Sequence, residues 1–386
     1  MIGGNDGGVR RRFWTGYILG LGTLVALTLA IIGVFHAVFV RPQMRDYAAA
    51  TPVRPEPRKD FVTLKGEGVF TRGVFAECRY MGPITDIACG EYGGTPEKVV
   101  VIAGGSGAVL FDRGGRLKSV IRFSRSNLGD VRIMGVAGTR RCQFVAGGGY
   151  GTLPALLDSD GRLLWSCTVS GFSGMTGGDL DGDGSQEFAM WSRDGIVCLE
   201  TNGRAKWGLR IFKALSMVVG RPEGTDRDRI ITRTEEAGKV YMIHIDERGR
   251  IVKKARTSRN GWELQLFRIP GAAGRQYLLD VQRDELCLMD LNGKTVRRYT
   301  APGAGYETRG VAMKSGEGRG YWAAFAGRGL GWKTMVHVFD SDGKLAFAEF
   351  IPETGTGLAA VDLEGKGNDT LLVGGEGKVW RYSLRK

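Results

Sequence analysis

LDSDGRLLW, residues 157–165, decides the fold because its pattern returns along the chain. An acid, two further residues, glycine and then arginine or lysine recur in six segments: FDRGGR (111–116), LDSDGR (157–162), LETNGR (199–204), IDERGR (245–250), MDLNGK (289–294) and FDSDGK (339–344). Their glycines are 42–50 residues apart. Repeats of this length are typical of propellers and solenoids.

Each segment predicts a tight hairpin between two strands. Asp-Gly and Asn-Gly supply the positive φ angles that two-residue turns require, so we expect turns of that type. Two further strand-like runs precede each hairpin, for example ITDIA (84–88) and KVVVIAGG (98–105) in the first repeat. Four strands per repeat without a helical period predict a propeller blade.

The ends of the chain are expected to close the ring. The last repeat, from Gly357 to Lys386, supplies three strands, and DFVTLKGEGVF (60–70) offers the missing outer strand. Closure removes exposed sheet edges, which would otherwise invite aggregation. We therefore predict an all-β, seven-bladed β-propeller over residues 61–386, tethered by one N-terminal transmembrane helix.

Two sets of residues resemble known propeller repeats. Trp165 and Trp207 stand four residues after the turn glycine, and Phe347 takes that place in DSDGKLAF. This pattern resembles the D-x-x-G-K-x-x-W repeat of the quinoprotein-like (PQQ-like) propellers. The loop DLDGDGSQE (179–187) is similar to FG-GAP and VCBS repeats, found in integrin α-chain propellers. The resemblance covers about 320 residues and implies a fold more than an activity.

The resemblance does not extend to the quinone cofactor. Quinone-dependent dehydrogenases of that fold typically have eight blades and a disulfide between adjacent cysteines. This chain has no adjacent cysteines, so no PQQ is expected.

The N-terminal region reads as a membrane anchor. Residues 13–40 contain no Lys, Arg, Asp or Glu, which suits a spanning helix of about 20 residues and exceeds the apolar core of a signal peptide. The tail at 1–12 carries three adjacent arginines, which favours a cytoplasmic N-terminus and an extracytoplasmic body, as in a bacterial inner membrane facing the periplasm. The proline-rich stretch at 41–60 is expected to be a semi-rigid spacer.

A pair of glycines in the predicted anchor allows close helix packing. Gly16 and Gly20 form a GxxxG pair, so weak dimerisation through this face is possible in principle. Glycine is common in spanning helices, and chance spacing is the alternative interpretation.

The stretch GGDLDGDGSQEF (177–188) predicts a calcium site. The FG-GAP resemblance implies five ligands in the loop between the first two strands of the third blade: Asp179, Asp181, Asp183, Ser185 and Glu187. Oxygen ligands at alternating positions suit Ca²⁺. The alternative is a solvated acidic turn, but four carboxylates in nine residues repel one another without a cation. One intact copy indicates a structural ion and not a catalytic one.

The last repeat holds a degraded copy of this loop, DLEGKGNDT (362–370). Asp362 and Glu364 match the first two acids, whereas Lys366 and Thr370 replace the third and fourth. We expect the Lys366 ammonium to substitute for the ion here.

Composition excludes few partners. The net charge is +13, but no nucleic-acid motif is present, so a dispersed basic surface without nucleic-acid binding is expected. The six cysteines form no CxxC pair and are interpreted as buried small residues, with one or two disulfides left open.

No catalytic constellation stands out. His36 lies in the predicted anchor, and His244 and His337 lie on strands where packing is the simpler interpretation. We therefore expect a non-catalytic, membrane-anchored scaffold that binds another protein, in the manner of the BamB-like propellers that share the quinoprotein repeat.

The alternative function is an enzyme or glycan-binding protein that uses the central funnel. Its candidates are placed near the starts of the innermost strands and share no chemistry: Asp86, Met175, Trp262 and Glu307.

Overall fold

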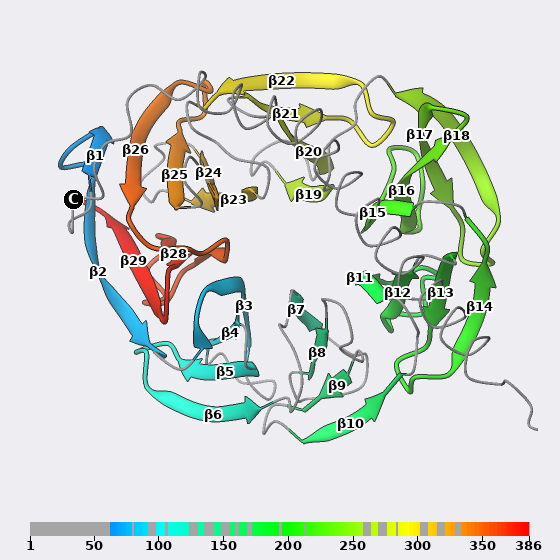
Figure 1. The fold of residues 1–386 in the computed structure, drawn as a ribbon, viewed down its shortest axis with the longest axis horizontal. Coiled ribbons are helices and arrows are strands. Elements are labelled where there is room, and N and C mark those ends of the chain that lie inside the picture. Colours follow the sequence, from blue (N-terminus) through cyan, green and yellow to red (C-terminus); the bar gives the residue numbers. More distant parts are fainter. Residues whose placement is uncertain are drawn as a thin grey trace, which may run out of the picture. The chain divides into compact units, whose positions relative to one another are not determined.

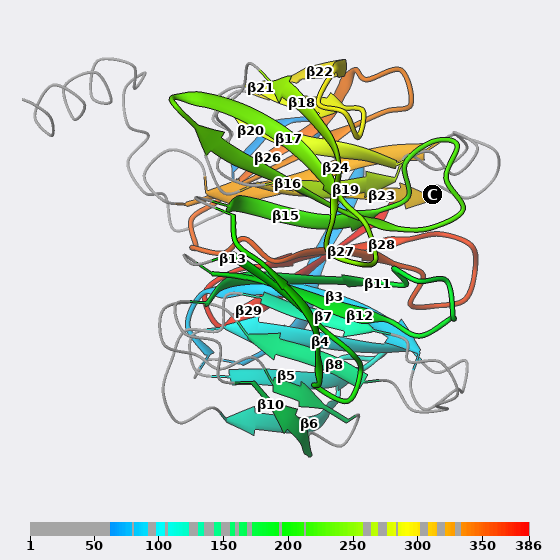
Figure 2. The same ribbon diagram turned by 90° about the vertical axis from the view of Figure 1, so that its right-hand side faces the viewer.

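The computed structural model describes most of the chain after residue 61. The described residues are 62–78, 81–91, 98–104, 107–122, 130–134, 143–147, 155–158, 162–167, 172–192, 195–211, 214–257, 264–268, 276–282, 285–301, 308–314, 321–328 and 333–385. They form strands joined by turns and loops, gathered into seven antiparallel sheets. Figure 1 shows these sheets set around a ring, and Figure 2 shows the ring from its side.

Sheets one to four each follow the chain from the innermost strand outward. Sheet one contains β3 (Ile84–Glu91), β4 (Lys98–Gly104), β5 (Gly107–Asp112) and β6 (Leu117–Arg122). Sheet two contains β7 (Asp130–Met134), β8 (Gln143–Gly147), β9 (Ala155–Leu157) and β10 (Leu163–Ser166). Sheet three contains β11 (Phe172–Gly178), β12 (Glu187–Ser192), β13 (Gly195–Leu199) and β14 (Ala205–Leu209). Sheet four contains β15 (Ala214–Gly220), β16 (Arg229–Glu236), β17 (Lys239–Ile245) and β18 (Ile251–Thr257).

The remaining sheets include the strands from the start of the described chain. Sheet five contains β19 (Gln265–Arg268), β20 (Gln276–Gln282), β21 (Glu285–Met289) and β22 (Thr295–Thr300). Sheet six contains β23 (Thr308–Lys314), β24 (Tyr321–Arg328), β25 (Thr334–Phe339), β26 (Leu345–Ile351) and, outermost, β1 (Val62–Lys65). Sheet seven contains β27 (Leu358–Val361), β28 (Thr370–Gly374), β29 (Lys378–Leu384) and, outermost, β2 (Phe70–Glu77).

The core lies between the sheets. Each buried apolar cluster joins two neighbouring sheets, from sheets one and two round to sheets seven and one. The innermost strands of consecutive sheets also contact one another, with β27 contacting β3 where the ring closes. Burial between stacked sheets is the main stabilising term of this architecture.

For the described residues the predicted fold class is corrected to an all-β propeller without a tethering helix. No helix among the described residues is long and apolar enough to cross a membrane. The segments 1–12, 13–40 and 41–60, with Gly16 and Gly20, lie outside the described residues. The anchor, the dimerisation face and the extracytoplasmic location stay predictions from the sequence.

The predicted closing strand was also wrong. Residues 62–65 do not complete the last sheet, because β1 pairs with β26 and becomes the fifth strand of sheet six. Sheet seven is completed by β2, which pairs with β29 from Phe70↔Leu384 to Glu77↔Lys378. The physical reason is burial: β2 places Phe70, Phe75 and Ala76 in the core, whereas β1 buries none of its four residues fully.

The hairpins occur where the repeat predicts them, but their turn type differs. In the fourth hairpin the Gly249 N–H donates to the Asp246 carbonyl, and the Asp246 N–H donates to the Arg250 carbonyl. The Asp246 carboxylate accepts a further hydrogen bond from the Arg250 N–H, at 2.8 Å. Only the glycine has a positive φ, +78°, and the register shifts beside it. This is a longer turn with a glycine bulge, not the expected two-residue turn.

The described cysteines match the sequence interpretation. Cys78, Cys198 and Cys287 are buried, Cys89 and Cys167 are half-buried, and no two of these five described cysteines form a disulfide. Burial raises the pKa of the Cys198 thiol to about 12, which keeps it protonated and unreactive.

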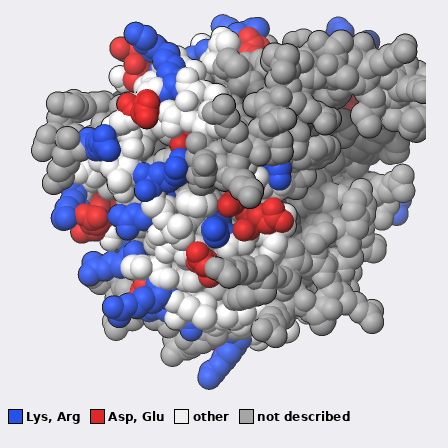
Figure 3. All heavy atoms as spheres, turned by 60° about the vertical axis from the view of Figure 1, so that its left-hand side comes forward, with Lys and Arg blue, Asp and Glu red and all other residues white. Residues whose placement is uncertain are grey.

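The basic residues are dispersed. Figure 3 shows one face of the molecule, on which Lys and Arg side chains alternate with Asp and Glu.

Candidate metal site

The acidic loop joins β11 to β12 in sheet three, as expected from the sequence. Gly182 and Gly184 both have positive φ, +81° and +85°, which lets the loop bend twice within three residues. The Leu180 side chain is fully buried and pins the loop to the core between sheets three and four. These features hold the acidic side chains close to the sheet end.

Three of the five predicted ligands are brought together. Asp179, Asp181 and Glu187 each offer a carboxylate oxygen, and these oxygens lie within 4.8 Å of one another. The Asp183 carboxylate instead accepts a hydrogen bond from the Ser185 N–H, at 2.7 Å. Hard oxygen donors at such separations fit a calcium ion.

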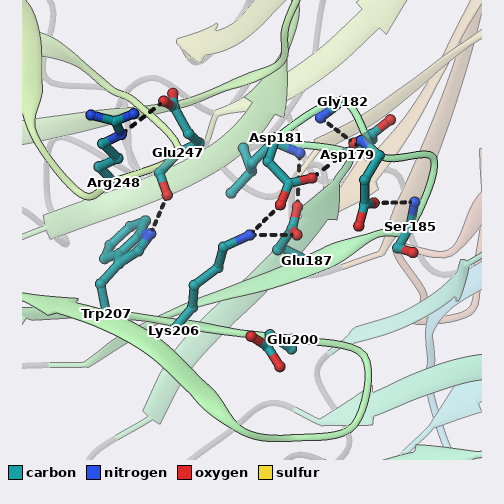
Figure 4. Close-up of polar contacts among 12 residues, drawn as sticks. Asp179, Asp181, Gly182, Ser185, Glu187, Glu200, Lys206, Trp207, Glu247 and Arg248 are labelled. Carbon is teal, nitrogen blue, oxygen red and sulfur yellow. Dashed lines mark hydrogen bonds and ion pairs between the residues drawn. The ribbon is translucent and has the colours of Figure 1, made fainter.

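Backbone hydrogen bonds orient the clustered carboxylates (Figure 4). Asp179 accepts from the N–H groups of Gly182 and Gly184, at 2.7 and 3.1 Å. Glu187, only 4% exposed, accepts from the Leu180 N–H at 2.9 Å. A buried carboxylate with a single neutral donor still needs a compensating cation.

Lys206 supplies that positive charge. Its ammonium, on β14, lies 2.6 Å from Asp181 Oδ2 and 2.9 Å from Glu187 Oε1 (Figure 4). Burial alone would lower the pKa of Lys206, but the hydrogen bonds to both carboxylates outweigh it and raise the pKa above its usual value. The same contact lowers the pKa of Asp181. Lys206 thus pairs with two of the five predicted calcium ligands, Asp181 and Glu187.

Sequence reasoning missed Lys206. It is 25 residues from Asp181 along the chain, and only the pairing of β13 with β14 brings it beneath the loop. A usable signal existed: Lys206 stands three residues after a turn glycine, beside Trp207, in the same repeat as the loop.

The degraded loop in sheet seven behaves partly as predicted. The Lys366 ammonium bonds Glu364 at 2.7 Å. Asp362, however, accepts from the backbone N–H groups of Lys366 and Gly367, at 3.0 and 2.7 Å. The Lys366 side chain therefore pairs with Glu364, and backbone N–H groups donate hydrogen bonds to Asp362.

The funnel candidates do not form a site among the described residues. Asp86 is buried and accepts a hydrogen bond from the adjacent Ile87 N–H. Met175 packs in the apolar cluster between sheets two and three. Trp262 and Glu307 lie outside the described residues.

The two strand histidines are buried, as expected. His244 and His337 are each 1% exposed, and His36 lies outside the described residues. His244 Nε2 lies 2.8 Å from the Leu291 carbonyl, which assigns the ring proton to that nitrogen. Burial lowers the pKa of His244, so it remains neutral.

The comparisons establish the fold. No protein-family model matches the chain, and no curated protein matches it in sequence. The propeller of BBS1N, solved in complex with ARL6DN, is 13% identical with a TM-score of 0.58, over 83% of this chain and 96% of that one. Streptogramin B lyase is 13% identical with a TM-score of 0.58, over 83% of this chain and 100% of that one. The WD40 domain of Neurospora crassa Pan2 is 11% identical with a TM-score of 0.53, over 83% of this chain and 97% of that one.

The chain is a β-propeller. At these identities the likeness shows the fold alone, and it reaches both BBS1N, solved in complex with ARL6DN, and a lyase. The finer resemblance to PQQ-like or FG-GAP repeats has no matching family model.

Proposed function

We propose that this chain is a non-catalytic protein-interaction subunit whose propeller presents its outer strands to a partner. The observation that carries the proposal is the set of large apolar side chains exposed on those strands: Leu64, Val74, Leu117, Val120, Leu163, Leu164, Ile251, Val252 and Val296. Exposed apolar groups that form a contiguous patch are typical of binding surfaces.

The frame is rigid enough to serve as a platform. Neighbouring sheets are stapled at the perimeter, where Trp165 Nε1 donates to the Thr201 carbonyl at 2.7 Å and Trp207 Nε1 donates to the Glu247 carbonyl at 2.9 Å. They are also joined near the centre, where the Gly310 N–H donates to Gln265 Oε1 at 2.7 Å. The BBS1N neighbour shares this fold and was solved in complex with ARL6DN, which supports an interaction role.

The acidic loop supports a structural role within this platform. Two of its carboxylates, Asp181 and Glu187, bind the Lys206 ammonium, and Asp179 and Asp183 accept hydrogen bonds from backbone N–H groups of the loop itself. We keep Ca²⁺ as a proposed ligand that competes with the lysine for the same oxygens.

The enzyme alternative has weaker support. Within the described part of the chain the acidic loop is the one group of three or more potential metal-binding side chains, and Lys206 pairs with two of its three carboxylates. The lyase neighbour shares the fold at 13% identity, which carries no residue-level correspondence.

Photo-crosslinking tests the proposal. Benzoylphenylalanine replaces Leu117, Leu163 or Val252, on the outer strands of sheets one, two and four, in the full-length chain in its native membrane fraction. Replacement of the exposed Asp226, in the loop between β15 and β16, is the matched control. We expect a discrete protein adduct from at least one outer-strand position and none from the control. No adduct from any outer strand would contradict the proposal.

A further inference from the structure

The chain contains three Asn-Gly steps, and two of them lie in described hairpin turns. Asn202-Gly203 stands between β13 and β14 of sheet three, and Asn292-Gly293 stands between β21 and β22 of sheet five. Asn260-Gly261 lies outside the described residues. The amide of an asparagine before glycine is open to attack by the glycine nitrogen, because glycine has no Cβ to obstruct the approach.

The two described turns hold the attacking nitrogens alike. The Gly203 N–H donates to the Glu200 carbonyl, and the Gly293 N–H donates to the Asp290 carbonyl, each at 2.9 Å. Both glycines have a positive φ, +84° and +88°, and both asparagines are exposed. A difference in reactivity between the two steps therefore has to come from the side chains around each amide.

The Asn202 amide is held at both ends within its own turn. Its Oδ1 accepts a hydrogen bond from the Arg204 N–H at 2.8 Å, and its Nδ2 donates to the Glu200 carboxylate at 3.4 Å. The backbone donor is neutral and fixed in place. It therefore provides no positive charge that could move with the amide oxygen.

The Asn292 amide instead contacts a cation from the neighbouring sheet. Lys253 stands opposite His244 in the pairing of β18 with β17, and His244 contacts the Leu291 carbonyl of sheet five, so Lys253 faces sheet five as well. The Lys253 ammonium donates to Asn292 Oδ1 at 2.7 Å. Since an ammonium can only donate, this contact fixes which amide atom is the oxygen.

We propose that Asn292 is a self-modifying site at which the turn converts asparagine to aspartate, and that Lys253 promotes the reaction. The Gly293 nitrogen attacks Asn292 Cγ, the bond from Cγ to the amide nitrogen breaks, and ammonia leaves with the proton lost from the Gly293 nitrogen. The succinimide that remains is opened by water to aspartate or isoaspartate. Lys253 stabilises the negative charge that develops on Oδ1 during the attack, and its flexible stem lets the ammonium follow that oxygen.

The aspartate product fits this turn. Asp342 holds the equivalent place in FDSDGK (339–344), where its N–H donates to Asp340 Oδ1 at 3.0 Å, as the Asn292 N–H donates to Asp290 Oδ1 at 2.9 Å. A carboxylate at position 292 turns the hydrogen bond from Lys253 into an ion pair between sheets four and five. Isoaspartate instead adds a methylene to the backbone and should disrupt the hydrogen bonds of the turn.

Peptide mapping by mass spectrometry tests this inference. The full-length chain in detergent is aged at physiological pH and temperature, and conversion at Asn202 and Asn292 is followed in the same samples. Asn292 should convert faster than Asn202, and Lys253→Met should slow conversion of Asn292 about threefold, as expected for an exposed charge contact, without changing Asn202. The matched variant Lys254→Met removes the adjacent ammonium, which bonds Glu236 at 2.5 Å, and should leave both rates unchanged.

The same measurement in urea separates structure from local sequence. In the unfolded chain the two rates should approach each other, because the Lys253 contact is lost. Three results would overturn the inference: conversion of Asn292 no faster than that of Asn202 in the folded chain, no effect of Lys253→Met, or the same excess at Asn292 in urea. The last result would show that the preceding residue, Leu291 or Thr201, sets the rate.

Discussion

At the residue scale, Lys206 is the cation that the acidic loop requires in this structure. The sequence predicted that the clustered carboxylates need a positive charge and assigned that charge to a calcium ion, which stays a prediction. The lysine approaches from a strand edge, and contacts of that kind follow from sheet pairing, which residue spacing within a loop cannot show. The loop position between two strands was predictable because its glycines and aspartates stand next to apolar strand runs.

Removal of the Lys206 ammonium should distinguish its contribution to stability from that of a bound Ca²⁺ ion. Lys206→Met leaves the buried Glu187 without its partner and should lower the free energy of unfolding by about 1–3 kcal/mol in EDTA, measured by urea titration. Lys344→Met, at an exposed turn, should change it by less than about 0.5 kcal/mol. Millimolar Ca²⁺ should restore the stability of Lys206→Met more than Mg²⁺ does. Equal stability in Ca²⁺ and EDTA would reject the calcium proposal.

His244 should make stability fall in mild acid. Its pKa in the folded protein is below the unfolded value of about 6.5, so the unfolded chain binds the proton first as pH falls. Its contribution is complete above pH 6.5 and is lost below it, by up to about 1.4 kcal/mol per pH unit. His244→Gln should remove this slope between pH 5 and 6.5 in urea titrations. An unchanged slope would mean that another group titrates.

At the scale of elements, the hairpins were the most predictable feature. The acid and the glycine act locally: the carboxylate accepts the N–H four residues later, and the glycine takes the left-handed bulge. What the sequence could not show is the next contact, in which a residue four positions after the glycine donates to the turn of the following sheet. Trp207 does so with its indole, and Arg297 does so with its guanidinium toward Ser341.

The contact of Trp207 with the following turn predicts that alanine at Gly249 lowers stability more than alanine at Gly224. A methyl group at Gly249 would lie 2.9 Å from the Trp207 ring, whereas one at Gly224 meets nothing within 4 Å. Both have nearly the same positive φ, so each pays a similar conformational penalty, about 1 kcal/mol. Gly249→Ala should destabilise by about 1–3 kcal/mol more than Gly224→Ala in thermal unfolding. Equal losses would show that the Trp207 contact is loose.

At the scale of the whole molecule, ring closure depends on both ends of the described chain. The repeat predicted that an N-terminal strand closes the last sheet. The N-terminal region contains two strands, and the one that closes the sheet is β2, which buries more apolar side chains than β1. Glu349, only 2% exposed, ties these ends together. It accepts hydrogen bonds from Tyr382 at 2.5 Å, from Thr63 at 3.2 Å and from Arg72.

Loss of this contact should loosen the closure. Tyr382→Phe removes the hydroxyl that bonds a buried carboxylate, which should cost about 1.5–3 kcal/mol. Hydrogen exchange should rise in residues 70–77 and 378–384, with protection in sheets three and four unchanged. Uniform loss of protection would instead indicate that the ring unfolds as a single unit and that closure is not a separate step.

The central claim is that this propeller works by holding another protein. Affinity purification of the detergent-solubilised full-length chain, with the stoichiometry of co-purifying proteins measured by quantitative mass spectrometry, tests it most directly. We predict one partner near a 1:1 ratio, reduced several-fold in the outer-strand variant Leu163→Glu/Leu164→Glu and retained in the loop variant Asp226→Asn. Recovery of the chain alone from its native cells would contradict the claim.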